Sequence, residues 1–284
     1  SGCGKTTVGR TLLRLYEPTG GKVLFNGEEV TNKNITALRK EMQIIFQDPY
    51  ASLDPRKSVI EIIAEYMIIN RTLPTKREIY NRAAHLMDVV GLARRYAAAY
   101  PHELDGGRRQ RIGIARALSV NPKFIVCDEP VSALDVSIQA QVLNLLMELK
   151  KERNLTYIFI THNLSVVEYI SDRIAVMYLG RIVELASTEQ IFENTMHPYT
   201  EALLSAIPIV DPDSKHSRIV LEGDVPNPVH PPEGCHFHPR CPNCMEICKH
   251  VSPPLVKHMV NGEEHFCACH LYDAPEEQVT STKG

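Results

Sequence analysis

Two short apolar runs, FIVC at 124–127 and YIFI at 157–160, restrict the possible folds of this chain more than any other feature. Each run is apolar at successive positions, which is the pattern of a strand buried on both faces of a parallel sheet. The segment between them, QAQVLNLLMELKKE, has the apolar spacing of an amphipathic helix. Strand, helix and strand in this order predict a right-handed βαβ unit within a doubly wound α/β fold.

Periodicity and proline content divide the chain further. Helical spacing over about 55–118 predicts an inserted helical subdomain, and another strand is expected at 43–46. Two more strands are expected in RIAVMYL and RIVEL, after which prolines become frequent. We therefore predict a main domain at 1–194 with its N-terminal strands missing, a separate extension at 195–273, and a disordered tail at 274–284.

The overall composition excludes some classes of function. The 284 residues carry a net charge of −3 and are 44% hydrophobic, which is enough for a buried core. That charge supplies no basic field for coating nucleic acid or an anionic membrane. No apolar run is long enough to span a bilayer, and no signal peptide is recognisable. We expect no nucleic-acid partner and only local contact with a membrane.

The opening residues, SGCGKTT, have the pattern of the second half of a phosphate-binding loop, G-x-x-x-x-G-K-S/T. In such a loop the glycines let backbone N–H groups approach phosphates, Lys5 reaches the β- and γ-phosphate oxygens, and the Thr6 hydroxyl can ligate Mg²⁺. A glycine turn before an ordinary helix is the alternative. Because the first two positions of the motif are absent, we expect the sequence to be a fragment. The predicted nucleotide-binding residues here are Ser1, Gly2, Cys3, Gly4, Lys5, Thr6 and Thr7.

Two adjacent acidic residues follow the first apolar run, in FIVCDEP. Carboxylates at the end of a buried strand suit nucleotide hydrolysis, with Asp128 holding Mg²⁺ through water and Glu129 polarising the attacking water. An acidic turn without function is the alternative. It does not explain why the phosphate loop, this acidic pair and His162 after the next strand occur in this order. The sequence therefore predicts a Mg²⁺-dependent nucleotide hydrolase.

Six motifs stand in the order typical of the nucleotide-binding subunits of ABC transporters, which the chain resembles: the phosphate loop, IIFQ, LDGGRRQ, CDEP, SALD and THN. The resemblance implies a P-loop NTPase fold of the ABC type that binds and hydrolyses ATP. It also implies that Gln47 senses the γ-phosphate and Mg²⁺, and that His162 contacts the γ-phosphate. The expected catalytic residues are Glu129, His162 and Gln47, and Gln47 and Asp128 are also expected at the nucleotide and Mg²⁺. Communication between two nucleotide sites is expected from Ser132, Ala133, Leu134 and Asp135.

The segment LDGGRRQ departs from the family's usual L-S-G-G-Q pattern. In this family the segment closes over ATP held by a partner, so two subunits are implied. The carboxylate of Asp105 would repel a γ-phosphate that a serine hydroxyl would bind, and the site closed by this chain would then hydrolyse ATP slowly. Alternatively, Asp105 is simply a helix N-cap and Arg108 supplies compensating positive charge. The expected contact residues are Leu104, Asp105, Gly106, Gly107 and Arg108.

Three more segments, QDPYASLDPR, LRLYEPTGGKVLFNG and VMYLGRIVE, are similar to the ATPases of oligopeptide and dipeptide importers, specifically the second of their two paired ATP-binding subunits. MHPYTEALLSAIP followed by a cysteine-containing extension resembles the tail of that group. The resemblance implies a heterodimer with a second ATP-binding subunit, two membrane permeases, an extracytoplasmic peptide-binding protein, and a peripheral position on the cytoplasmic face of the inner membrane. Import of nickel or another solute, a soluble ABC ATPase with a zinc-binding tail, and an inactive truncated product are alternatives.

Six of the eight cysteines lie after residue 234, four of them in GCHFHPRCPNCMEICKH. Because disulfides are rare in the cytosol, clustered cysteines there indicate metal ligands. The transporter group's tail is similar to regions that hold a 4Fe–4S cluster, and the matching ligands are Cys235, Cys241, Cys248 and Cys269. Zn²⁺ at a knuckle that includes Cys244, or reduced thiols without metal, are alternatives. We expect a structural role, because this proline-rich tail needs a cross-link to become ordered.

Overall fold

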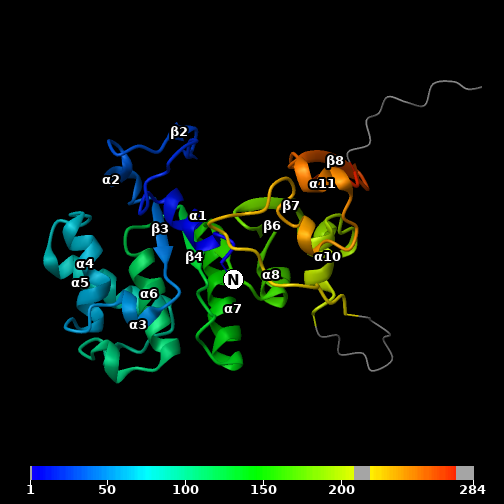
Figure 1. Ribbon diagram of the computed structural model, residues 1–284. Helices are drawn as coiled ribbons and strands as arrows, with labels where there is room; N and C mark the ends of the chain where they lie inside the picture. The colour runs from blue at the N-terminus through cyan, green and yellow to red at the C-terminus, as the bar shows by residue number, and fades with distance from the viewer. Residues whose placement is uncertain (1, 208–217, 273–284) are drawn as a thin grey trace, which may run out of the picture. The chain divides into compact units, whose positions relative to one another are not determined.

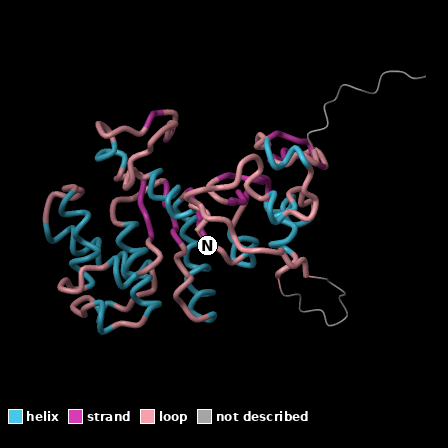
Figure 2. The backbone as a smooth tube through the Cα atoms, viewed as in Figure 1, coloured by secondary structure: helices cyan, strands magenta, loops and turns pink. Residues whose placement is uncertain are grey.

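The computed structural model describes residues 2–207 and 218–272 and divides the chain into two compact units (Figures 1 and 2). Unit 1 comprises residues 1–5 and 163–284, and unit 2 comprises residues 6–162. In chain order the elements are α1 (Lys5–Leu12), β1 (Leu24–Phe25), β2 (Glu28–Glu29), α2 (Ile35–Leu38), β3 (Met42–Ile45), α3 (Pro49–Ser52), α4 (Val59–Ile69), α5 (Lys76–Val89), η1 (Arg94–Tyr96), η2 (Pro101–Glu103), α6 (Gly106–Leu118), β4 (Phe124–Asp128), α7 (Val136–Arg153), β5 (Thr156–Ile160), α8 (Leu164–Ile170), β6 (Arg173–Tyr178), β7 (Arg181–Ser187), α9 (Thr188–Glu193), α10 (Pro198–Leu204), η3 (His238–Arg240), α11 (Glu246–His250), β8 (Val256–Val260) and β9 (Glu263–Cys267).

Unit 2 is built on a parallel sheet in the order β3-β4-β5. Strand β4 is central, because Ile125 pairs with Gln43 on one side and with Tyr157 on the other. The first run predicted to be buried on both faces is buried, with Val126 and Cys127 at 0% exposure. For the second run the prediction is wrong, because β5 lies at the edge of the described sheet and its Ile158 is 36% exposed. That burial also raises the pKa of the Cys127 thiol. Helix α7 connects the parallel strands β4 and β5, so the expected strand, helix and strand unit is present.

A second part of unit 2 is helical. Helices α4, α5 and α6 pack against one another, and α6 also contacts α3 and β3 (Figure 1). Capping boxes start two of these helices, at Ser58 with Glu61 and at Thr75 with Glu78. These helices occupy the range where the sequence predicts an inserted helical subdomain.

Unit 1 contains an antiparallel sheet in the order β6-β7-β9-β8. Its core includes Phe237, whose ring centroid lies 5.2 Å from that of Tyr178 and 5.3 Å from that of Tyr199. A buried pair links two strands, since His265 Nε2 of β9 lies 2.7 Å from Glu184 Oε1 of β7 and both side chains are 0% exposed. Much of the chain after residue 194 therefore shares a core and a sheet with β6 and β7.

The hairpin β8–β9 is the main difference from the sequence-based expectation. Apolar periodicity predicts no strand after residue 194, whereas β9 pairs with β7 and extends the sheet. The predicted boundary between residues 194 and 195 consequently falls inside unit 1. As a division between family modules it stays a prediction, and the predicted tail at 274–284 lies outside the described residues.

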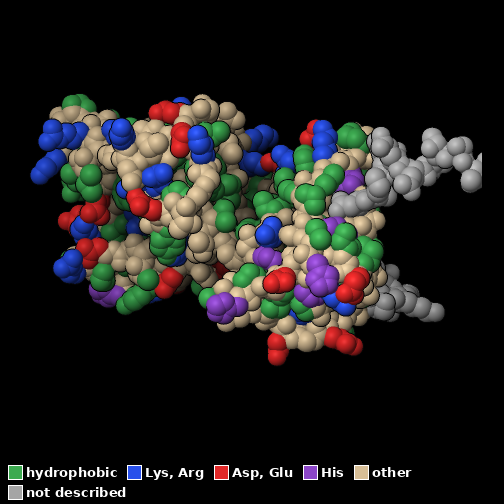
Figure 3. Space-filling view, turned by 45° about the horizontal axis from the view of Figure 1, so that its top comes forward, with side chains coloured by type: hydrophobic (Ala, Val, Ile, Leu, Met, Phe, Trp, Pro, Cys, Tyr) green, Lys and Arg blue, Asp and Glu red, His purple; other side chains and the backbone are tan. Residues whose placement is uncertain are grey.

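The surface agrees with the small net charge. On the face shown in Figure 3, Lys and Arg side chains are mixed with Asp and Glu side chains over unit 2 instead of forming a field of one sign. No helix within 2–207 and 218–272 combines the length and the apolar composition that crossing a bilayer requires.

Candidate functional site

Asp128 is the last residue of β4, and only 1% of it is exposed. Thr6, in the first turn of α1, donates from Oγ1 to Asp128 Oδ1 at 2.8 Å. The other carboxylate oxygen is buried and has no hydrogen-bond partner among the described residues. A hydroxyl and a carboxylate with a spare buried oxygen are the kind of oxygen ligands that Mg²⁺ prefers. The residues present therefore fit the predicted metal ion.

Arg10 is a residue of this site that the sequence analysis does not single out. Its Nη2 atom lies 3.6 Å from Asp128 Oδ2. Arg10 follows Thr6 by four positions on α1, and this spacing places both side chains on one face of the helix. The spacing is visible in the sequence, but the proximity to Asp128 requires the packing of α1 on the sheet.

Glu129 follows Asp128 at a sharp turn, with a φ angle of +47° in the left-handed region that strains residues other than glycine. Its amide donates to the Ile160 carbonyl at 2.9 Å. Gln47 Nε2 donates to Glu129 Oε2 at 3.0 Å, and His162 Nδ1 lies 3.3 Å from Glu129 Oε1. The carboxylate is 15% exposed, so it is enclosed and yet reachable by water. The three predicted catalytic side chains thus meet just past the carboxyl ends of three neighbouring parallel strands.

The predicted phosphate-binding loop precedes Thr6 directly in the chain. Gly2 and Gly4 have φ angles of +84° and +93°, as a sharply turned loop requires. Lys5 Nζ donates to Cys3 Sγ at 3.3 Å, and because a thiol is a weak acceptor, the ammonium group stays available for a stronger one. The remaining residues predicted here are Thr7, which is exposed, and Ser1, which lies outside the described residues.

In the altered signature, the segment LDGGRRQ, Asp105 is the N-cap of α6. Its carboxylate accepts from the Arg108 amide at 2.8 Å and pairs with the Arg108 guanidinium at 2.6 Å. The two side chains are 56% and 43% exposed, so the pair is a surface pair whose opposite charges offset each other. Contact of this segment with ATP held by a partner stays a prediction.

The signature glycines pack against the start of α7 and the residues before it. A Cβ atom at Gly106 would lie 3.3 Å from Leu134 Cδ2, and one at Gly107 would lie 2.5 Å from Ile138 Cγ2. Leu104, which precedes them, is 4% exposed. Only glycine therefore fits at Gly107 without displacing its neighbour.

The segment predicted to communicate between nucleotide sites begins beside Glu129. Ser132 Oγ donates to the Glu129 carbonyl at 3.1 Å, and Ala133 is exposed. Asp135 caps α7 by accepting from the Ile138 amide at 3.0 Å, and this bond lowers the pKa of the Asp135 carboxyl. Direct contacts within unit 2 therefore connect Glu129 with the segment at 132–135, and that segment and the start of α7 with the glycines of LDGGRRQ.

The cysteines predicted to bind metal lie near one another in unit 1. The Cys235 amide donates to the Cys248 carbonyl at 2.8 Å. Burial raises the pKa of the Cys235 thiol, and the nearby Cys248 and Cys244 raise it further. Burial likewise raises the pKa of Cys241 to about 11, with contributions from Cys269, Cys235 and Cys244. None of the eight cysteines, all of which lie within the described residues, forms a disulfide bond.

Within the described residues, however, no three His, Cys, Asp or Glu side chains converge closely enough to hold one metal ion. Neither the predicted cluster nor the zinc alternative therefore has a preformed set of ligands among these residues. Cys267 is buried in β9 and pairs in the sheet with Val256 and Glu184.

Two protein families match the chain. Residues 1–132 match the family described as ABC transporter, and residues 183–248 match the family described as oligopeptide/dipeptide transporter, C-terminal region. The first range includes Thr6, Gln47, Asp128 and Glu129, and the second includes three of the four predicted cysteine ligands.

Curated proteins similar to the chain carry related descriptions. The oligopeptide transport ATP-binding protein AppF of Bacillus subtilis is 51% identical over 278 residues, which are 96% of this chain and 83% of AppF. OppF of the same organism is 58% identical over 223 residues, which are 77% of this chain and 73% of OppF. A putative peptide import ATP-binding protein of Brucella ovis is 51% identical over 272 residues, covering 95% of this chain and 84% of that protein.

Solved structures similar to the chain are ATP-binding cassettes. The structure of cbiO1 from Clostridium perfringens, part of an ABC transporter complex, has a TM-score of 0.61 and 29% identity, covering 68% of this chain and 76% of cbiO1. A dimeric cassette in a post-hydrolysis state bound to ADP and phosphate has a TM-score of 0.59 and 28% identity, covering 66% of this chain and 81% of the cassette.

Proposed function

This chain belongs to the ABC transporter ATP-binding proteins of the oligopeptide and dipeptide group, and from that membership we propose that it hydrolyses ATP to energise peptide import. The observation that carries this function is the carboxylate of Glu129, held between Gln47 and His162. The match of 183–248 to a transporter C-terminal region favours peptide import over the alternatives of a soluble ABC ATPase and of an importer for nickel.

The described contacts support a role for each residue in hydrolysis. Asp128 and Thr6 hold Mg²⁺, while Lys5 and the loop amides bind the phosphates. Bound Mg²⁺ neutralises charge on the β- and γ-phosphates. Glu129 accepts a hydrogen bond from the attacking water and polarises it. Gln47 and His162 donate to that carboxylate and fix its orientation, which makes hydrolysis depend on the positions of two separate loops.

We extend the proposal to the assembly. The chain pairs with a second ATP-binding subunit, and its signature, Leu104 to Arg108, closes over the ATP of that partner. Residues 132–135 then report between the two sites, and Gln47 relays the state of the site to two membrane permeases. An extracytoplasmic peptide-binding protein delivers the peptide, and this chain lies peripherally on the cytoplasmic face of the membrane. The dimeric state of a similar cassette supports the first step.

For the cysteines we propose a 4Fe–4S cluster bound by Cys235, Cys241, Cys248 and Cys269. These thiols are close enough to influence one another's pKa, but they do not converge on one point. What supports the cluster is the chemistry of the donors, since four thiolates are the usual ligands of such a cluster, together with the resemblance of this tail to cluster-binding regions. Its role here is a cross-link between the segment at 234–241, α11 and the end of β9.

The proposed hydrolysis is tested on the purified transporter with Glu129→Gln, which keeps the size of the side chain but removes its charge. We expect ATP turnover to fall by about 100-fold or more, peptide uptake to stop, and ATP binding to persist. Glu148→Gln, at an exposed position on α7, is the matched control and leaves turnover unchanged. Turnover retained in Glu129→Gln would overturn the proposed role.

The proposed cluster is tested by iron, sulfide and zinc content and the visible spectrum of protein purified without oxygen. Iron and sulfide near four per chain, lost in Cys235→Ser or Cys248→Ser, are expected. One zinc per chain without iron would instead assign the cysteines to a zinc site.

A further inference from the structure

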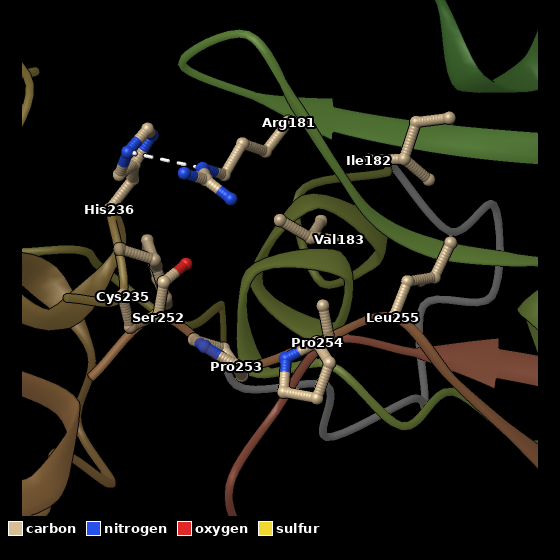
Figure 4. Close-up of a pocket in the computed structure, with 11 residues that line it drawn as sticks. Arg181, Ile182, Val183, Cys235, His236, Ser252, Pro253, Pro254 and Leu255 are labelled. Atoms are coloured by element: carbon tan, nitrogen blue, oxygen red, sulfur yellow. Dashed lines mark hydrogen bonds between the residues drawn. The ribbon is translucent and has the colours of Figure 1, made fainter.

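Unit 1 contains a cavity of about 320 Å³ that is separate from the ATP site and borders the cysteine region (Figure 4). It lies between the start of β7, the segment at 235–237, the loop at 252–255 and the residue after β9. Two bonds connect the residue after β9 and the segment at 235–237 to β7 and the turn before it, since the Ala268 amide donates to the Val183 carbonyl at 2.8 Å and His236 Nδ1 lies 3.0 Å from the Leu179 carbonyl oxygen. The cavity is therefore part of the folded unit.

The lining is mostly apolar. Val183, Phe237 and Ala268 are buried, while Ile182 and Leu255 are each 40% exposed. A cavity of this size is at the lower end of those that bind small molecules, and an apolar lining with few polar groups is typical of such sites. Its volume suits a ligand of one or two residues.

One end of the cavity is cationic. Arg181 Nε donates to His236 Nε2 at 3.3 Å (Figure 4). The other ring nitrogen, His236 Nδ1, lies 3.0 Å from the Leu179 carbonyl oxygen. Among residues 2–207 and 218–272, no carboxylate forms an ion pair with Arg181. A guanidinium group presents a planar fork of donors that matches a carboxylate, and here the apolar wall lies directly beside it.

We propose that this cavity binds a small molecule with a carboxylate on an apolar body: an apolar amino acid or the C-terminal end of a short apolar peptide. The carboxylate pairs with Arg181, and the apolar side chain fills the space over Val183, Phe237 and Ala268. The source of the ligand rests on the proposed function, because an importer of peptides releases such molecules. The chemistry of binding rests on the cavity alone.

Cys235 also lines the cavity. A ligand would therefore contact both β7 and the first of the predicted cluster ligands, and it would join the loop at 252–255 to the sheet. Peptide arriving through the transporter would in this way bind to a module of the ATPase outside the ATP site.

Isothermal titration calorimetry on the full chain, without nucleotide, tests the proposal with leucine, leucyl-leucine, leucinamide and acetate. We expect leucine or leucyl-leucine to bind, and leucinamide and acetate to fail, since one lacks the carboxylate and the other the apolar body. Binding of leucine alone identifies an amino acid, and binding of leucyl-leucine alone identifies a peptide. Acetate binding as well as leucine, or no binding of either leucine compound at millimolar concentration, would overturn the proposal.

Variants locate the binding. Arg181→Gln should weaken it by about ten-fold or more through loss of a charged hydrogen bond, while Arg181→Lys should retain part of it. Arg173→Gln, an exposed arginine on the adjacent strand β6, is the matched control and should bind as the original chain does. Equal affinity in Arg181→Gln and Arg173→Gln would reject this cavity. The Glu129→Gln variant should bind leucine or leucyl-leucine as the original chain does. Failure of the ATPase proposal and failure of this one are therefore distinguishable.

Discussion

His197 lies at the N-cap of α10 with 1% of its surface exposed, and its Nδ1 atom accepts from the Tyr199 amide at 3.1 Å. Burial lowers its pKa to about 4. In the unfolded chain the pKa of His197 is about 6.5, so between that pH and 4 the unfolded state binds a proton that the folded state does not bind. The stabilisation is complete above pH 6.5 and is lost as the pH falls towards 4, by about 3 kcal/mol at most. The unfolding midpoint in urea should therefore fall over this range.

His197→Asn isolates this contribution, because asparagine does not titrate and its side-chain oxygen can still accept at the N-cap. Circular dichroism in urea at pH values from 4 to 7 compares the two chains. The midpoint of the variant should fall less steeply than that of the original chain. Parallel curves would show that His197 does not cause the acid sensitivity.

At the scale of elements, the contact between α6 and α7 depends on a missing side chain at Gly107. A Cβ atom there would lie 2.5 Å from Ile138 Cγ2, so Gly107→Ala should destabilise unit 2 by roughly 1–3 kcal/mol through overpacking. Gly113→Ala in the same helix meets no atom within 4 Å and should stabilise by roughly 0.5–1 kcal/mol, because alanine favours helix. Thermal melts measure both, and adding Ile138→Ala to Gly107→Ala should recover stability. Similar melts for the two glycine variants would contradict the packing argument.

At Gly234 two segments of the cysteine region approach each other closely. It has a φ angle of +65°, and a Cβ atom there would lie 2.4 Å from the Cys248 carbonyl oxygen. Gly234→Ala should therefore separate Cys235 from Cys248 and lower the iron and sulfide content by more than about half. Gly262→Ala, which has φ of +85° but open space around it, carries the backbone strain without the clash. Equal iron content in both variants would show that this close approach does not hold the ligands.

At the scale of the molecule, the predictable parts were those encoded locally. The runs at β4 and β5 predict parallel strands, and because Gln47, Glu129 and His162 each follow such a strand, their convergence follows from topology. The β8–β9 hairpin was not predicted because apolar and polar residues alternate only weakly in VKHMV and EEHFC. Its turn, Asn261-Gly262, with φ angles of +53° and +85°, is nevertheless a hairpin signal that the sequence contains. The cavity beside Arg181 could not be predicted, since it depends on four segments distant in the chain.

The altered signature has its consequence in the assembled transporter. We expect two unequal nucleotide sites, because the site closed by this chain faces Asp105 and Arg108, which are already paired with each other. In the complex, Glu129→Gln should abolish most ATP turnover, by about 100-fold, while the matching change in the partner should reduce it by less than about two-fold. Equal losses would end the idea of asymmetry.

Rebuilding the family's usual pattern with Asp105→Ser and Arg108→Gln tests the cause. Serine retains an N-cap acceptor for α6 and removes the negative charge that repels a γ-phosphate. In this background the matching glutamate change in the partner should become as damaging as Glu129→Gln, because both sites then turn over. Asp88→Ser with Arg94→Gln removes another exposed ion pair of unit 2 and should leave the inequality intact. The opposite outcome is that the rebuilt signature leaves the two sites unequal, although this chain would then present the same closing residues as an unaltered cassette. In that case the difference between the sites must originate in the partner subunit.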